Sequence, residues 1–460
     1  AAARFEGAVD AGALVLTDSD STTFAGAVEA GDVLLSDSTT GVTFEDDLSA
    51  ASLTSANNGF AVALVGPDTL VTGATVLANT NGVTLGDDGD RLAFDGGLLS
   101  VASTTGISGD VSTATGDLRL GEAFLTGDST LTSTERSVLV ASLDLDGFDL
   151  ALSADDQLEI DELLDGARVE LLDATVGTFG EFATDQLQIT DGTSYRFEGP
   201  LTANDVTAAN ADTALAFLND LTVDGTTMLM NTGGNVFGDD DGDVQVFTGG
   251  LTATAAPATT AAGIRARTGG LTLAGVTLAG DTVLDATDDG AATGTTIVTG
   301  GIVGGGNDLT IVGGADGAST LASVFGAGTT TVVSASTFDV TGSLDTGALD
   351  LQGADGTVFT IGGALTADTL ATAGNASVVT LNGTGTDVVD AVVFDNTGGV
   401  FLGDDAGDVL TFRGGLDTTA SLLTTRGESR TSGSAITLGT TELADDTEFD
   451  ATTNGTFAGA

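Results

Sequence analysis

A short period of about 20 residues constrains the fold of this chain more than any other feature. Phe5, Phe24 and Phe44 each open a line of alternating apolar and polar residues, at spacings of 19 and 20. Alternation predicts strands with one buried face, and the Gly, Asp, Ser and Asn between them predict sharp turns. One such line cannot bury its inner face alone. The sequence therefore predicts an all-β parallel β-solenoid with rungs of about 20 residues.

The chain also has a longer repeat, each copy of which contains several of these 20-residue lines. A module with the order apolar run, Asn-Thr, Gly, acidic loop, alternating strand and Gly-Gly-Leu occurs three times, and its final Leu recurs after 153 and then 165 residues. Segments on either side keep the same offsets, which predicts three tandem copies of a unit of 150–165 residues in one continuous solenoid. The modules are Ala74–Leu98, Thr226–Leu251 and Ala391–Leu416, and the copies are 1–150, 151–310 and 311–460.

One segment has two interpretations. Ser153–Gly166 has a Ser followed by acids and then apolar residues, which is typical of a helix start. The same segment also aligns with the first line of the chain, with Ile160 on Phe5. We therefore expect a strand here.

The charge of the chain limits its partners. It has 67 acidic residues against 11 basic ones, all Arg, and a net charge of −56. Such a surface repels nucleic acid and anionic membranes, so we expect neither as a partner, and no stretch is apolar enough to insert into a bilayer. High salt or bound cations would relieve the self-repulsion, which suits a halophilic setting.

The acidic loops of the modules are the candidate metal site. Clustered carboxylates separated by Gly are the kind of oxygen ligands that Ca²⁺ prefers, so calcium is the candidate cofactor. The alternative is a solvated turn on a highly acidic surface. The candidate ligands are Asp87, Asp88, Asp90, Asp239, Asp240, Asp241, Asp243, Asp404, Asp405 and Asp408.

The two ends of the sequence suggest self-association. Neither end has an atypical polar capping repeat, and uncapped solenoids can pair strands end to end into an open fibre. The starting Ala residues also suggest a mature end left after signal removal. The candidate polymer contacts are Ala1, Ala2, Ala3, Phe5, Phe449, Phe457 and Ala460, and the candidate glycan acceptors are Asn375, Asn382 and Asn454.

The sequence lacks several residue types that commonly act in catalysis. It has no His, Lys, Cys or Trp, which excludes thiol nucleophiles, His bases and Ser-His-Asp triads. Nitrogen- or sulfur-ligated metals such as zinc are disfavoured for the same reason. Paired carboxylates could cleave polysaccharides, but sugar sites usually need exposed aromatic rings, and the 21 Phe recur at rung-like core positions. We therefore expect no enzyme.

Lines such as FAGAV and VLLSDSTTGVTF, which begin at Phe24 and Val33, resemble secreted bacterial β-helix proteins of the filamentous-haemagglutinin and autotransporter-passenger type. The resemblance implies an extracellular or cell-surface β-helix used in adhesion, matrix or filament building. We expect a head-to-tail homopolymer, with cations, glycans or a cell-surface ligand as further partners. The alternatives are a surface-layer or adhesin subunit and a β-helix polysaccharide-degrading enzyme.

Overall fold

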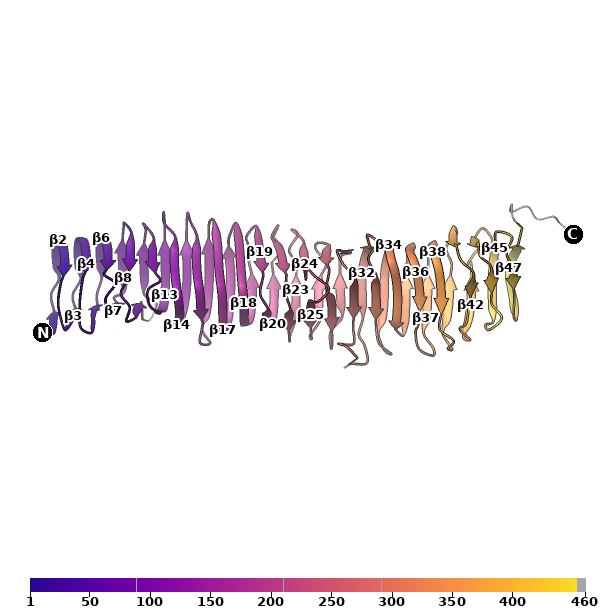
Figure 1. Ribbon diagram of the computed structural model, residues 1–460, viewed down its shortest axis with the longest axis horizontal. Helices are drawn as coiled ribbons and strands as arrows, with labels where there is room; N and C mark the ends of the chain where they lie inside the picture. The colour runs from indigo at the N-terminus through magenta and orange to yellow at the C-terminus, as the bar shows by residue number, and fades with distance from the viewer. Residues whose placement is uncertain (88, 210, 291, 453–460) are drawn as a thin grey trace. The chain divides into compact units, whose positions relative to one another are not determined.

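The computed structural model describes residues 1–87, 89–209, 211–290 and 292–452, without the side chain of Asp445. Within these ranges every regular element is a β-strand, and the strand pairs are parallel (Figure 1). The described ranges contain no helix long and apolar enough to cross a membrane. The prediction of an all-β parallel solenoid is confirmed.

The chain divides into two compact units. The first comprises residues 1–218 and 231–233, and the second comprises 219–230 and 234–460. This boundary falls inside the second sequence copy, whereas the sequence offsets predicted joins near 150 and 310.

Strands of three to 17 residues make up the first unit. They are β1 (Ala3–Phe5), β2 (Val9–Leu16), β3 (Ser21–Phe24), β4 (Val28–Leu35), β5 (Gly41–Phe44), β6 (Leu48–Ser55), β7 (Ala61–Leu64), β8 (Asp68–Val71), β9 (Thr75–Leu77), β10 (Val83–Leu85), β11 (Arg91–Phe94), β12 (Leu98–Ser100), β13 (Thr105–Thr113), β14 (Leu118–Ser133), β15 (Val138–Asp144), β16 (Asp149–Ala154), β17 (Gln157–Asp173), β18 (Val176–Ile189), β19 (Ser194–Phe197), β20 (Leu201–Ala208) and β21 (Ala214–Phe217).

Each coil of this unit contributes three strand segments, and each segment pairs with its counterpart in the next coil. Thus β10 pairs with β7 and β13, β11 with β8 and β13, and β12 with β9 and β14. Long strands such as β14 and β17 bend around a corner and supply two segments. The result is three stacks of strands around one core.

The core is built from inward-facing columns in which like residues stack. The centroids of the Phe5 and Phe24 rings lie 5.0 Å apart, those of Phe24 and Phe44 lie 4.9 Å apart, and the stacked rings are nearly parallel. Phe179, Phe197 and Phe217 form a second column of this kind. Because successive coils place the same position one strand spacing apart, identical side chains stack naturally. The prediction that the Phe lines face the core is confirmed for these residues.

The ambiguous segment is a strand. Residues 153–154 end β16 and residues 157–166 belong to β17, and Ile160 is fully buried opposite Phe179 of the following strand. Leu158 and Ile160 alternate inward before the chain bends toward Leu163. Pairing with coils on both sides outweighs the local helix-start pattern.

Strands of two to 17 residues make up the second unit. They are β22 (Leu221–Val223), β23 (Thr227–Leu229), β24 (Asn235–Phe237), β25 (Val244–Phe247), β26 (Leu251–Ala253), β27 (Ala258–Thr260), β28 (Gly263–Ala266), β29 (Leu271–Leu273), β30 (Val276–Leu278), β31 (Thr282–Asp285), β32 (Ile297–Val303), β33 (Leu309–Val312), β34 (Ala318–Ser334), β35 (Thr337–Val340), β36 (Leu344–Leu351), β37 (Val358–Ile361), β38 (Leu365–Thr372), β39 (Val378–Leu381), β40 (Thr386–Val388), β41 (Val392–Val393), β42 (Gly399–Leu402), β43 (Val409–Phe412), β44 (Leu416–Asp417), β45 (Leu423–Arg430), β46 (Ile436–Thr437) and β47 (Thr441–Asp450).

The sequence repeat is not a whole number of coils. Leu251 ends the Gly-Gly-Leu signal of the second copy, and its counterpart in the third copy is Leu416. The strand pairing nevertheless places Leu251 in the same stack as Val400. The intermediate partners of this stack are Leu271, Ile297, Ser319, Phe338, Phe359 and Val379. The module therefore moves by one face between these copies, and their acidic loops lie on different edges of the unit.

Candidate functional site

The repeated module is one coil, and its three sequence signals are its three corners. In the third copy, Asn396-Thr397 lies between β41 and β42, the acidic loop lies between β42 and β43, and Gly414-Gly415 lies between β43 and β44. The order of signals in the sequence is thus the order of corners around the coil.

A fully buried Asn forms the first corner. The side-chain amide of Asn396 donates to the main-chain oxygens of Ser377 and Gly399, both at 2.9 Å. Asn79 donates in the same way to Phe60 and Gly82. A buried carbonyl without a donor is costly, so this position requires an inward amide. Asn231 is also fully buried and donates to Thr213 at 3.0 Å.

The Gly-Gly corner needs both glycines, for different reasons. A Cβ on Gly414 would lie 2.2 Å from the main-chain nitrogen of Ala391, which stands one turn earlier in the chain. Gly415 has a φ of 126°, in the region that favours glycine, and its N–H donates to the oxygen of Phe412 at 3.1 Å. The other copies place Gly96-Gly97 and Gly249-Gly250 in the same two environments.

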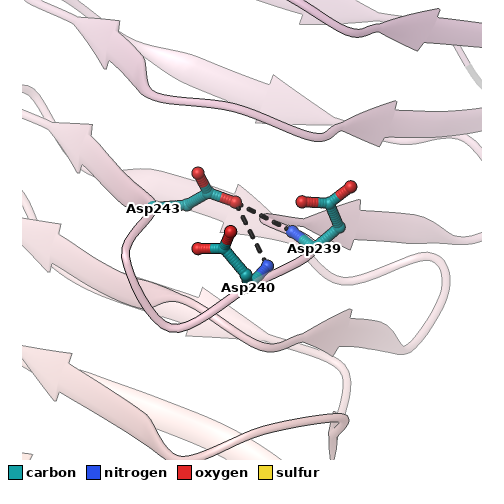
Figure 2. Close-up of side chains that lie close together, drawn as sticks. All are labelled: Asp239, Asp240 and Asp243. Atoms are coloured by element: carbon teal, nitrogen blue, oxygen red, sulfur yellow. Dashed lines mark hydrogen bonds between the residues drawn. The ribbon is translucent and has the colours of Figure 1, made fainter.

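The acidic corner is organised by its last carboxylate. Oδ2 of Asp243 accepts the main-chain N–H groups of Asp239 at 3.0 Å and Asp240 at 3.3 Å (Figure 2). In the third copy, Oδ2 of Asp408 accepts those of Asp404 and Asp405 at 2.8 and 3.0 Å. In the first copy, Asp90 accepts the N–H of Asp87 at 3.0 Å. The last acid of each loop therefore has a structural role, whatever the loop binds.

In the second and third modules, three carboxylates of the acidic corner come close enough together to share a cation. One oxygen from each of Asp239, Asp240 and Asp243 lies within 4.8 Å of the others, and Asp404, Asp405 and Asp408 form the same group. Oxygens that ligate Ca²⁺ at 2.3–2.6 Å have such separations. Asp241 is not part of the first group. Asp88 lies outside the described residues.

Electrostatics at the third acidic corner oppose full ionisation. Partial loss of contact with water raises the pKa of Asp404 above its ordinary value, and the neighbouring carboxylates of Asp408 and Asp405 raise it further. A cation or a proton would relieve this repulsion, and so would solvent screening. The geometry therefore accommodates both interpretations from the sequence, a calcium ligand set and a solvated acidic turn.

The predicted polymer contacts lie in the outermost described coils. Phe5 is 45% exposed although its ring belongs to an inward column. The amino group of Ala1 pairs with Asp20 at 3.1 Å, and Ala2 is exposed while Ala3 is half-buried in β1. Phe449 is half-buried in β47. Phe457 and Ala460 lie outside the described residues.

The candidate glycan acceptors differ in their surroundings. The amide of Asn375 donates to the oxygens of Gln352 and Gly353, and its Oδ1 accepts the N–H of Ser377. Asn382 is half-buried and lines a groove on the surface of the second unit. Asn454 lies outside the described residues.

Sequence reasoning missed the role of the corner Asn. The signal was the Asn-Thr pair repeated in each module, but repetition does not tell an inward side chain from an exposed one. No family model, curated protein or solved structure matches this chain. Its function is therefore argued from its own geometry.

Proposed function

We propose that this chain is an extracellular structural protein whose solenoid associates head to tail with further copies of itself. The observation that carries the proposal is the Phe column of the first coils. Phe24 is buried between the rings of Phe5 and Phe44, and Phe44 is buried between Phe24 and Leu64, whereas Phe5 stacks on Phe24 alone and stays 45% exposed. An apolar core surface of this kind gains free energy when another coil covers it.

The last described coil has a matching feature. Leu443 follows Leu402 and Thr425 in an inward column, and those two are fully buried, but Leu443 is 61% exposed. Strand β47 pairs with β45 on one edge. Parallel pairing of β1 and β2 of one copy with β47 of the next would extend both the sheets and the core.

Calcium belongs to the same proposal as a candidate ligand of the acidic corners. A divalent cation held by Asp404, Asp405 and Asp408 would offset the repulsion among them and stiffen the corner. Since the chain carries a net charge of −56, cations would also allow two copies to approach.

Negative-stain electron microscopy with and without Ca²⁺, at high and low salt, tests the proposal. With about 20 residues and about 4.8 Å per coil, each copy would add roughly 110 Å to a thread. Phe5→Asp should abolish threads, while the control Phe124→Asp, at an outward position that is also exposed, should leave them intact. Monodisperse particles under all conditions would overturn the proposal.

Lateral assembly is the second candidate, and one observation favours it. In the first unit an outward column of seven successive positions contains no acidic residue, despite the acidity of the chain. A second copy could approach this largely aliphatic stripe, whose own seven positions carry no carboxylate. The stripe comprises Val15, Leu34, Thr54, Val76, Leu99, Arg119 and Leu139.

Mutations distinguish head-to-tail assembly from lateral assembly. Placing Asp at both Leu34 and Leu99 should remove flat sheets or side-by-side pairs and spare single threads. We do not extend the proposal to polysaccharide cleavage, the third candidate. The single Tyr of the chain, Tyr195, is fully buried with its hydroxyl bonded to the oxygen of Asp191 at 2.8 Å, so its ring offers no platform for a sugar.

A further inference from the structure

The coil formed by β23, β24 and β25 has a polar interior. Each of its three faces turns one polar side chain inward: Thr227, Asn235 and Gln245, all buried. The corresponding inward positions of the third module hold Val392, Val400 and Leu410, and those of the first hold Thr75, Val83 and Leu92. Two amides thus replace two aliphatic side chains in the second module alone.

These amides lack protein partners. Neither Nδ2 nor Oδ1 of Asn235 has a hydrogen-bond partner among the described residues, and the residue is 2% exposed. Gln245 uses its Nε2 to donate to the oxygen of Asn219 at 2.9 Å, but its Oε1 has no such partner, and neither has Oγ1 of Thr227. Buried polar atoms without a protein partner are usually bonded to ordered water.

The following coil places a small side chain next to the amide of Asn235. Asn235 pairs with Ala258, whereas its counterpart Val400 pairs with Leu423. Other buried inward positions of that coil are also small, as at Ala253 and Ala262. An Asn above an Ala fills less of the core than a Val above a Leu. Unfilled space beside unpartnered polar atoms is where a water molecule is stable.

The chemistry of the atoms identifies the occupant. Asn235 leaves both a donor and an acceptor open, and Gln245 leaves an acceptor open. A metal cation could ligate the oxygens but would not accept the N–H of Asn235, and an apolar occupant would satisfy neither. We propose that the core beside Asn235 and Gln245 is a binding site for buried water, which bridges polar groups that the other two modules lack.

A crystal structure of the full chain at a resolution that shows ordered water is the direct test. We expect density for a water within hydrogen-bond distance of Nδ2 of Asn235 and at least one further polar atom of this coil. Density that shows the Asn235 amide bonded directly to Gln245 or to the main chain, with no water beside it, would overturn the proposal.

A solution measurement is independent of crystal growth. Water-oxygen magnetic relaxation dispersion counts long-lived internal waters. The double variant Asn235→Val with Gln245→Leu restores the third module's residues and should lose at least one such water. The control Asn382→Val, near the surface groove, should lose none. An unchanged count in a folded double variant would contradict the proposal, and if that variant does not fold, the crystal structure of the unaltered chain still decides it.

Discussion

The coils 227–247 and 392–412 carry the same module, yet they differ inside. Both turn their corners with Asp-anchored loops and Gly-Gly pairs, but one encloses Asn235 and Gln245 while the other encloses Val400 and Leu410. The corners are held by main-chain geometry that few residues can provide. The inward positions need only fill space and satisfy polar atoms, so they can differ between copies.

Introducing a polar inward residue into the third module should have the largest effect on the free energy of unfolding. Val400 is fully buried between Val379 and Leu423, so Val400→Asn would bury an amide where no small neighbour leaves room for water. We expect the free energy of unfolding to fall by roughly 4 kcal/mol. Denaturant unfolding measures this. The reverse change, Asn235→Val, should be neutral or stabilising, and equal losses from both changes would show that the two interiors do not differ.

Removing the corner amide should cost slightly less. Asn396→Ala leaves the buried oxygens of Ser377 and Gly399 without their side-chain donor, which should lower the free energy of unfolding by roughly 3 kcal/mol. The control Asn382→Ala should stay within about 0.5 kcal/mol of the unaltered protein. If the two variants unfold alike in denaturant, the corner amide is not what holds this turn.

The acidic corner should be more tolerant because Asp404 and Asp405 are exposed to water, although Asp408 itself is buried. Asp408→Ala removes the acceptor of two main-chain N–H groups, and we expect a loss of roughly 1–2 kcal/mol, since solvent can replace part of the interaction. Asp243→Ala should behave similarly in the second module. Calorimetric melting of both variants checks this. Unchanged melting temperatures would mean that the loops hold themselves without their last acid.

The smallest effect concerns pH. The pKa of Asp404 is raised in the folded state, so its ionised form costs stability above the folded-state pKa, and the cost vanishes below the ordinary value. Asp404→Asn should therefore be slightly more stable at neutral pH, within about 0.5 kcal/mol for this exposed group, and lose that advantage as the solution is acidified. Asp368→Asn, at an exposed position, serves as the control. An advantage that persists below pH 3.8 would contradict this account.

The fold could be predicted from the sequence because few folds can bury the apolar residues of a 20-residue period with alternating apolar and polar positions. The Phe5, Phe24 and Phe44 spacing predicted the coil length and the inward column to which these residues belong. The acidic corners were also recognisable as loops. The structural role of Asp408 was not, since sequence does not tell a carboxylate turned back to the main chain from one turned to solvent.

Two further features escaped prediction for related reasons. The sequence offsets of 153 and 165 residues suggested equivalent copies, but pairing register, which depends on every corner along the way, places Leu251 in the stack of Val400. Asn235 and Gln245 could have been noticed as polar residues at positions that are aliphatic in both other modules. Only the structure shows that they point inward.

Because the module can shift by one face between copies, the solenoid tolerates more lengths of inserted or duplicated segment than whole coils alone. A coil offers three equivalent places at which the chain can enter the next coil, so a duplicated or inserted segment need not restore the starting phase. It has only to end at some corner, about seven residues from the previous one when a rung is about 20 residues long. Segments of the gene could then be gained or lost in lengths that encode one third of a coil. Each such change would move the following acidic loops to a different corner of the solenoid.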